Sequence, residues 1–126
     1  MAKNPKELEI WKLSYNLALD FYKITDKFPK EESNNLTSQI RRAAVSMPVN
    51  IAEGCSRQTK RSFMQFLQYS YGSGKELNVL LMFAKDRGYI NAEEYKELFF
   101  RLEVLMKKLF NFMKFVNREK FFSWFK

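Results

Sequence analysis

Residues 60–87 read KRSFMQFLQYSYGSGKELNVLLMFAKDR, and this stretch decides the fold. Small and apolar residues recur along it alternately four and three positions apart, at Phe63, Leu67, Ser70, Gly74, Leu77, Leu81 and Ala84. This heptad spacing predicts one long helix with a continuous inward face, and Gly88 is expected to cap its C-terminus. Two glycines inside a helix cost about 1 kcal/mol each relative to alanine, so Gly72 and Gly74 indicate close approach of another backbone.

Two further helices are predicted before this one. Residues 5–27 follow the cap signal Asn4-Pro5 and stop before Phe28-Pro29. The apolar arc of this first helix is too wide for a single inward face. Residues 35–54 contain Pro48, which should kink the helix, and they carry a second set of inward positions at Leu36, Ile40, Ala43, Met47 and Ile51.

A fourth helix is predicted over residues 92–117, opened by a cap of the same kind at Asn91-Ala92-Glu93-Glu94. Its inward face is expected to consist of Tyr95, Phe99, Leu102, Met106, Leu109, Met113 and Val116. Four helices with short links predict an all-α fold, an antiparallel up-down four-helix bundle. We expect residues 1–126 to form a single domain, with an aromatic tail over residues 118–126.

The chain has no histidine and a single cysteine, Cys55. These absences remove the commonest general base, imidazole and thiolate metal sites, and any intramolecular disulfide. Acids such as Glu53 and Glu76 alone are a weak basis for catalysis, so we expect no enzyme, no metal and no cofactor. An unpaired cysteine fits a cytoplasmic location, and no stretch is apolar enough to span a bilayer. Cys55 is expected in a loop, where Arg57 could lower its pKa.

The net charge of +8 is concentrated in one part of the chain. Residues 34–62 carry five Lys and Arg against one acid, Glu53. Arg57, Lys60 and Arg61 surround the start of the third helix, where the positive end of the helix dipole disfavours cations. Three cations beside free backbone donors suit a phosphate, so this loop is the first candidate for contact with RNA. The alternative is a solvated loop without a ligand.

Arg41 and Arg42 also carry positive charge, and Arg42 is included among the candidate nucleic-acid contacts. Because both flank inward residues of the second helix, at least one of them is expected to pair with Glu53 or Glu76 in the bundle. Asn50 and Glu53 are expected to form a polar network beside the proline of that helix. Arg41, Asn50, Glu53 and Glu76 are therefore predicted to have structural roles.

Apolar residues remain after the inward faces are filled. Phe100, Val104 and Phe115 lie opposite the inward face of the fourth helix, and the tail contains Trp124. Contiguous exposed apolar residues mark interfaces more often than accidents, so these four residues predict self-association. In one alternative the tail folds back over its own bundle. In another the basic aromatic end binds a membrane surface, but regular helix seams argue against that, and we expect no membrane partner.

The most specific segment of the chain is SQIRRAAVSMPVNIAEG, residues 38–54, and it is followed by Phe63, Phe66-Leu67, Gly72-Ser73 and Glu76-Leu77. Together with YKITDKFP at residues 22–29, this pattern resembles the four-helix-bundle family encoded in intervening sequences of bacterial large-subunit ribosomal RNA genes. The resemblance covers most of the chain, from Trp11 to Gly88-Tyr89.

This resemblance implies an antiparallel bundle that assembles as a ring, expected to be a homopentamer. The chain is also similar to the accessory variability determinant of diversity-generating retroelements, a pentameric basic bundle that binds nucleic acid and a reverse transcriptase. The ribosomal branch of the family has no established activity. Asn35 stands where the family usually has Gly, and Tyr69 and Tyr71 where small residues are common, which affects local packing rather than the fold.

Two functions of different classes remain open. The first is a non-enzymatic ring that holds RNA through its phosphates, as an intervening-sequence or ribosome-associated accessory protein. The second is a protein-interaction scaffold, whose aromatic surface and tail bind a partner while the charge keeps it in solution. Salt separates the two, because phosphate binding weakens steeply as salt rises and an apolar interface responds little.

Overall fold

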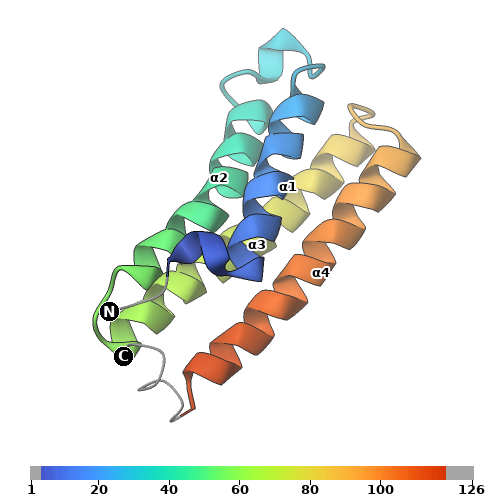
Figure 1. The fold of residues 1–126 in the computed structure, drawn as a ribbon. Helices are drawn as coiled ribbons and strands as arrows, with labels where there is room; N and C mark the ends of the chain where they lie inside the picture. The colour runs from blue at the N-terminus through green and yellow to red at the C-terminus, as the bar shows by residue number, and fades with distance from the viewer. Residues whose placement is uncertain (1–3, 119–126) are drawn as a thin grey trace.

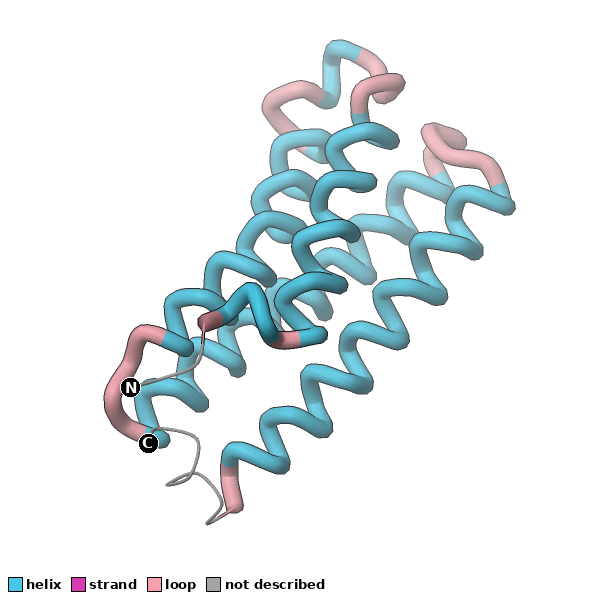
Figure 2. The backbone as a smooth tube through the Cα atoms, viewed as in Figure 1, coloured by secondary structure: helices cyan, strands magenta, loops and turns pink. Residues whose placement is uncertain are grey.

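A computed structural model of the protein describes residues 4–118, which form four antiparallel helices joined by short loops (Figure 1). The helices are α1 Glu9–Thr25, α2 Leu36–Cys55, α3 Lys60–Asp86 and α4 Ala92–Val116. Each helix packs against its two neighbours in the cyclic order α1, α2, α3, α4. The predicted all-α up-down four-helix bundle is therefore confirmed. No strand occurs within residues 4–118 (Figure 2).

The first helix begins later than the sequence predicts. Asn4 acts as a cap, and its side-chain oxygen accepts a hydrogen bond from the backbone N–H of Lys6 at 3.0 Å, but the helix it opens is a short 3-10 turn, η1 Pro5–Glu7. Leu8 then adopts an extended conformation, with a ψ of 132°, and turns its side chain into the core. The extended backbone that buries Leu8 interrupts the helix at this residue. As a result α1 starts at Glu9, and η1 lies at an angle to it (Figure 2).

The remaining helix ends follow local hydrogen-bonding chemistry. Asn91 and Glu94 form a reciprocal capping box at the start of α4, as predicted. Gly88 has a φ of +79°, and its N–H donates to the carbonyl of Lys85 while the N–H of Tyr89 donates to the carbonyl of Ala84. This is a Schellman motif, and it confirms Gly88 as the C-terminal cap of α3. A second 3-10 turn, η2 Lys30–Glu32, lies in the loop between α1 and α2.

The predicted inward faces of α2 and α3 are buried at every position. On α4, the buried face is rotated about the helix axis from the predicted one. Leu98 and Leu105 are buried on α4, while the predicted Phe99 and Met106 are only partly buried. Because α4 contacts both α3 and α1, its apolar face is wide. Compact leucines occupy the centre of that face, and Phe99 stacks on Tyr95 at its edge, with ring centroids 5.6 Å apart.

The most extensive helix pair is α2 with α3, and Gly74 lies in the crowded part of the core beside it. A Cβ on Gly74 would overlap Met106 Sδ and would come within 2.9 Å of Met47 Cε. The crowding predicted for this glycine is therefore present, although side chains rather than a backbone produce it. For Gly72 the prediction is wrong, because a Cβ there would meet nothing within 4 Å.

Gly72→Ala is expected to raise the free energy of unfolding by about 0.5–1 kcal/mol, because alanine in open helical space only removes the excess backbone entropy of glycine. Gly74→Ala gains the same helix contribution but forces Met106 and Met47 to move, which costs about 1–3 kcal/mol. Urea unfolding followed by circular dichroism should show the first variant to be more stable than the second. Equal stability of the two variants would contradict the crowding at Gly74.

Candidate nucleic-acid interface

The turn between α2 and α3 holds Arg57 in a fixed position. One terminal nitrogen of its guanidinium, Nη2, donates to Glu53 Oε2 at 3.0 Å, and the guanidinium carbon lies 4.5 Å from the ring centroid of Phe66. Arg57 is thus paired and stacked, with part of its side chain covered. Of the three predicted phosphate contacts, it is the least free to reach a ligand.

Lys60 and Arg61 border a hollow of about 550 Å³ at the start of α3. The other residues around this hollow are Met64, Gln65, Gln68 and Asn117. Lys60 Nζ donates to the backbone carbonyl of Asn117 at 3.2 Å, which links the start of α3 to the end of α4. Arg61 is exposed, and its side chain makes no ion pair within residues 4–118. We call this hollow, with its six lining residues, the α3 hollow.

The stretch of chain that supplies most of the α3 hollow carries no negative charge. The sequence contains no acidic residue between Glu53 and Glu76, and Glu53 is already paired with Arg57. Thr59 caps α3 by accepting a hydrogen bond from the N–H of Ser62. Cations at the start of a helix are disfavoured by its dipole, and an anion between them would relieve that repulsion.

The predicted pairing of Arg41 or Arg42 with Glu53 or Glu76 is wrong. Arg41 Nη2 is 2.9 Å from Asp26 Oδ1 in the α1–α2 loop, and its guanidinium lies over the ring of Tyr22. Arg41 lies near the start of α2, so it meets the end of α1 across the loop, whereas Glu53 is three turns further along the helix. Arg42 and Glu76 are both exposed, and neither makes an ion pair within the described residues.

The predicted polar network beside Pro48 is present in part. Asn50 Nδ2 donates to both the carbonyl and the hydroxyl oxygen of Ser46, at 2.9 and 2.8 Å, across the proline that lies between them. The hydroxyl of Ser46 is in turn 2.8 Å from that of Ser73 on α3. This network secures α2 to α3. Glu53 takes no part in it, because that side chain points to Arg57.

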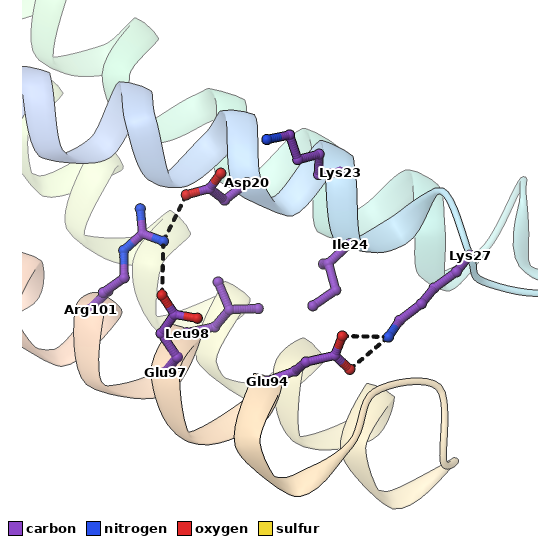
Figure 3. A pocket seen from close by; sticks show the side chains of 8 residues that line it. All are labelled: Asp20, Lys23, Ile24, Lys27, Glu94, Glu97, Leu98 and Arg101. Atoms are coloured by element: carbon purple, nitrogen blue, oxygen red, sulfur yellow. Dashed lines mark hydrogen bonds and ion pairs between the residues drawn. The ribbon is translucent and has the colours of Figure 1, made fainter.

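Charges also line a second hollow, of about 410 Å³, between α1 and α4 (Figure 3). Here cations and carboxylates are paired across the two helices: Lys27 with Glu94, Arg101 with Asp20, and, further along, Lys108 with Glu9. The hydrogen bond from Lys27, helped by the N–H of Asn91, lowers the pKa of Glu94. Because these charges satisfy each other, this surface is a helix seam rather than an anion site.

Two exposed apolar surfaces remain. Phe100 is 66% exposed and lines a hollow between α3 and α4 with Val104, Tyr71 and Phe110. The predicted interface residues Phe100 and Val104 are thus brought together. Phe115 lies apart from this hollow, at the end of α4, and Trp124 lies outside the described residues.

The second apolar surface is a groove between α1 and α2, which we call the α1–α2 groove. It has a volume of about 320 Å³ and an almost wholly apolar lining of Trp11, Tyr15, Ala18, Leu19, Tyr22, Val45, Pro48, Val49 and Ala52. Sequence reasoning did not place an interface here. The signal was the apolar arc of the first helix, which is too wide for one inward face.

Cys55 is the last residue of α2 and is buried, with 3% of its surface exposed. Burial raises the pKa of its thiol to about 11. The expectation of a loop thiol with a lowered pKa is therefore wrong. Within residues 4–118, no cluster of acids and cysteine could hold a metal ion, and no helix is both long and apolar enough to cross a bilayer.

A family model described as 23S rRNA-intervening sequence protein matches residues 6–111. The protein belongs to this family. The chain is also similar to the 1.70 Å crystal structure of a protein of unknown function from the S23 ribosomal protein family of Bacteroides thetaiotaomicron VPI-5482. The two have 21% sequence identity and a TM-score of 0.78, covering 83% of this chain and 95% of the other, which shows a common fold. No curated protein matches the chain.

The family resemblance inferred from residues 38–54 is confirmed by this match. The 23S rRNA-intervening sequence protein match spans α1, α2, α3 and most of α4, and it includes Arg57, Lys60 and Arg61. It ends before Phe115 and the tail. The similarity to the accessory variability determinant stays a prediction.

In this family member, Cys55 is expected to react slowly with Ellman's reagent in the folded state. A thiol with a pKa near 11 has a thiolate fraction at pH 8 about 100-fold below that of an ordinary cysteine, and burial blocks access as well. The reaction should become fast in urea and should follow the loss of helical circular dichroism. Complete labelling of the folded protein within seconds would contradict the buried position.

Proposed function

We propose that this protein is a non-enzymatic, cytoplasmic RNA-binding member of the 23S rRNA-intervening sequence protein family, an accessory to ribosomal RNA or the ribosome. The observation that carries the proposal is the α3 hollow, where Lys60 and Arg61 lie beside amide side chains and where residues 54–75 contain no acid. Its contents are the groups that proteins use to hold nucleic acid: cations for the phosphates and hydrogen-bonding side chains for sugar and base.

Lys60 and Arg61 are less engaged in contacts within the protein than Arg57 is, and this supports a role for both in phosphate binding. Among residues 4–118, Arg61 has no acidic partner and Lys60 bonds only a backbone carbonyl, which is a neutral acceptor that a phosphate oxygen can replace. Arg57 would contribute charge from its place over Phe66. The family description, which concerns 23S rRNA, supports RNA as the polyanion.

Changing Arg57, Lys60 and Arg61 together to Gln is expected to weaken RNA binding and to reduce its dependence on salt. Each phosphate contact to single-stranded nucleic acid contributes a slope of about −0.7 in a plot of log affinity against log salt, so three lost contacts should change the slope by about 2. Fluorescence anisotropy with a labelled 23S rRNA fragment at several salt concentrations measures both quantities.

The matched control changes Lys23, Lys30 and Lys96 to Gln. These lysines are exposed and lie toward the opposite end of the bundle, so the control removes the same charge from a different place. Equal loss of affinity in both triple variants would mean that only net charge matters, and an unchanged affinity in the first would reject the α3 hollow. In that second outcome the scaffold function becomes the better proposal.

A second proposal concerns self-association. The α1–α2 groove and the hollow around Phe100 lie on opposite edges of the bundle and differ in their lining, since Glu103 and Lys107 border the second while the first is almost wholly apolar. Two unlike surfaces favour a head-to-tail interface, in which the patch on one copy contacts a different patch on the next. With the family resemblance, this supports the expected ring-shaped homopentamer.

Multi-angle light scattering of the protein is expected to give a mass near five times 15.1 kDa. Leu19→Asp should lower this mass, because Leu19 is half-exposed in the α1–α2 groove and a carboxylate there opposes burial. Asn16→Asp is the control, since it adds the same charge at another exposed position of α1. A monomeric parent protein, or a mass unchanged in Leu19→Asp, would reject this interface.

A further inference from the structure

We infer that the α3 hollow binds unpaired nucleotides and contacts their bases, not only their phosphates. The inference rests on the proposed RNA binding and deepens it by naming the form of RNA. It comes from three features of the outward face of α3 that phosphate binding does not require: the glutamines Gln65 and Gln68, the apolar side chain of Met64, and the ring of Tyr69.

The glutamines supply acceptors as well as donors. Gln65 Nε2 donates to the hydroxyl oxygen of Tyr69 at 2.8 Å, which leaves its carbonyl oxygen without a partner in residues 4–118. Gln68 is exposed, and its whole amide is free within the same range. A phosphate at neutral pH only accepts hydrogen bonds, so amide oxygens gain nothing from it. The edge of a base offers both donors and acceptors, and it can satisfy both ends of an amide.

Tyr69 supplies an aromatic surface next to these amides. Its side chain is 50% exposed, and its ring packs against Phe66 with centroids 5.6 Å apart and planes at 86°. The hydrogen bond from Gln65 and the contact with Phe66 limit the rotation of this ring. A half-exposed tyrosine with restricted rotation loses little entropy when a base stacks on it. Stacking is tolerant of sequence, since every base has a π face.

The form of the RNA follows from where these groups lie. In an A-form duplex the base faces are stacked inside, and the major groove is too deep and narrow for side chains to reach the base edges. The wide minor groove leaves some base edges within reach of the amides of the hollow, but the ring of Tyr69 beside it can stack only on bases that have left the helix. Loops, bulges and single-stranded ends are therefore the preferred partners.

The test compares a labelled single-stranded RNA of about 12 nucleotides with the blunt duplex of the same sequence, by anisotropy at several salt concentrations. The parent protein should bind the single strand more tightly than the duplex. The double variant Gln65→Ala/Gln68→Ala and the variant Tyr69→Leu should each lose roughly 5- to 100-fold in affinity for the single strand, the range for one lost base contact. Their salt slopes should stay unchanged, and so should their affinity for the duplex.

The control Asn34→Ala/Asn111→Ala removes two exposed amides from other parts of the bundle and should bind like the parent. Circular dichroism checks that every variant keeps its helices. Equal affinity of the parent for both RNAs, or full single-strand affinity in the α3 variants, would overturn the inference. The proposed RNA binding would survive either result if the Arg57, Lys60 and Arg61 variant still lowers the salt slope. Absence of binding to both RNAs would reject the proposed function itself.

Discussion

The structure depends on the packing of α2 against α3 around Met47 and Ser70. The buried hydroxyl of Ser70 donates to the carbonyl of Met47 at 3.0 Å, and the Met47 side chain reaches toward Gly74 one turn further along. Pro48 has no N–H to donate to the carbonyl of Ala44. On either side of the proline, the Asn50 amide donates to the carbonyl of Ser46 and the Ser70 hydroxyl donates to the carbonyl of Met47, which ties this part of α2 to α3. These contacts fix α2 and α3 relative to each other, and the turn between the two helices leads into the positively charged start of α3.

The α2–α3 pair is also where sequence reasoning was most successful. Small residues such as Ser70 and Gly74 are needed wherever other groups approach closely, and such a requirement leaves a regular pattern in the sequence. The inward face predicted for α4 was displaced from the observed one because Phe99 and Leu98 are both strongly apolar in the sequence. Only the position of α1 decides which of the two lies at the centre of the face. The break at Leu8 escaped prediction for a similar reason, since burial of that leucine overrides a favourable local cap.

For the candidate site, the sequence indicated charge but not geometry. Arg57, Lys60 and Arg61 form one group in the sequence, yet Glu53 and Phe66 hold the first while the other two face the α3 hollow. The contribution of Gln65 and Gln68 was missed because exposed glutamines on a helix carry no signal until the surrounding shape is known. Arg41 shows the converse, since its partner Asp26 lies across a loop whose course no spacing rule predicts.

The paired charges between α1 and α4 make one edge of the bundle different from the others. These pairs are partly exposed, so dissolved ions weaken them, whereas the buried apolar contacts between α2 and α3 respond little to ionic strength. We therefore expect local opening to start along this edge, between α1 and α4, which no loop joins within residues 4–118. Since Asn117 at the end of α4 also borders the α3 hollow, we expect ionic conditions to act on the shape of the candidate site as well as on the attraction of its charges.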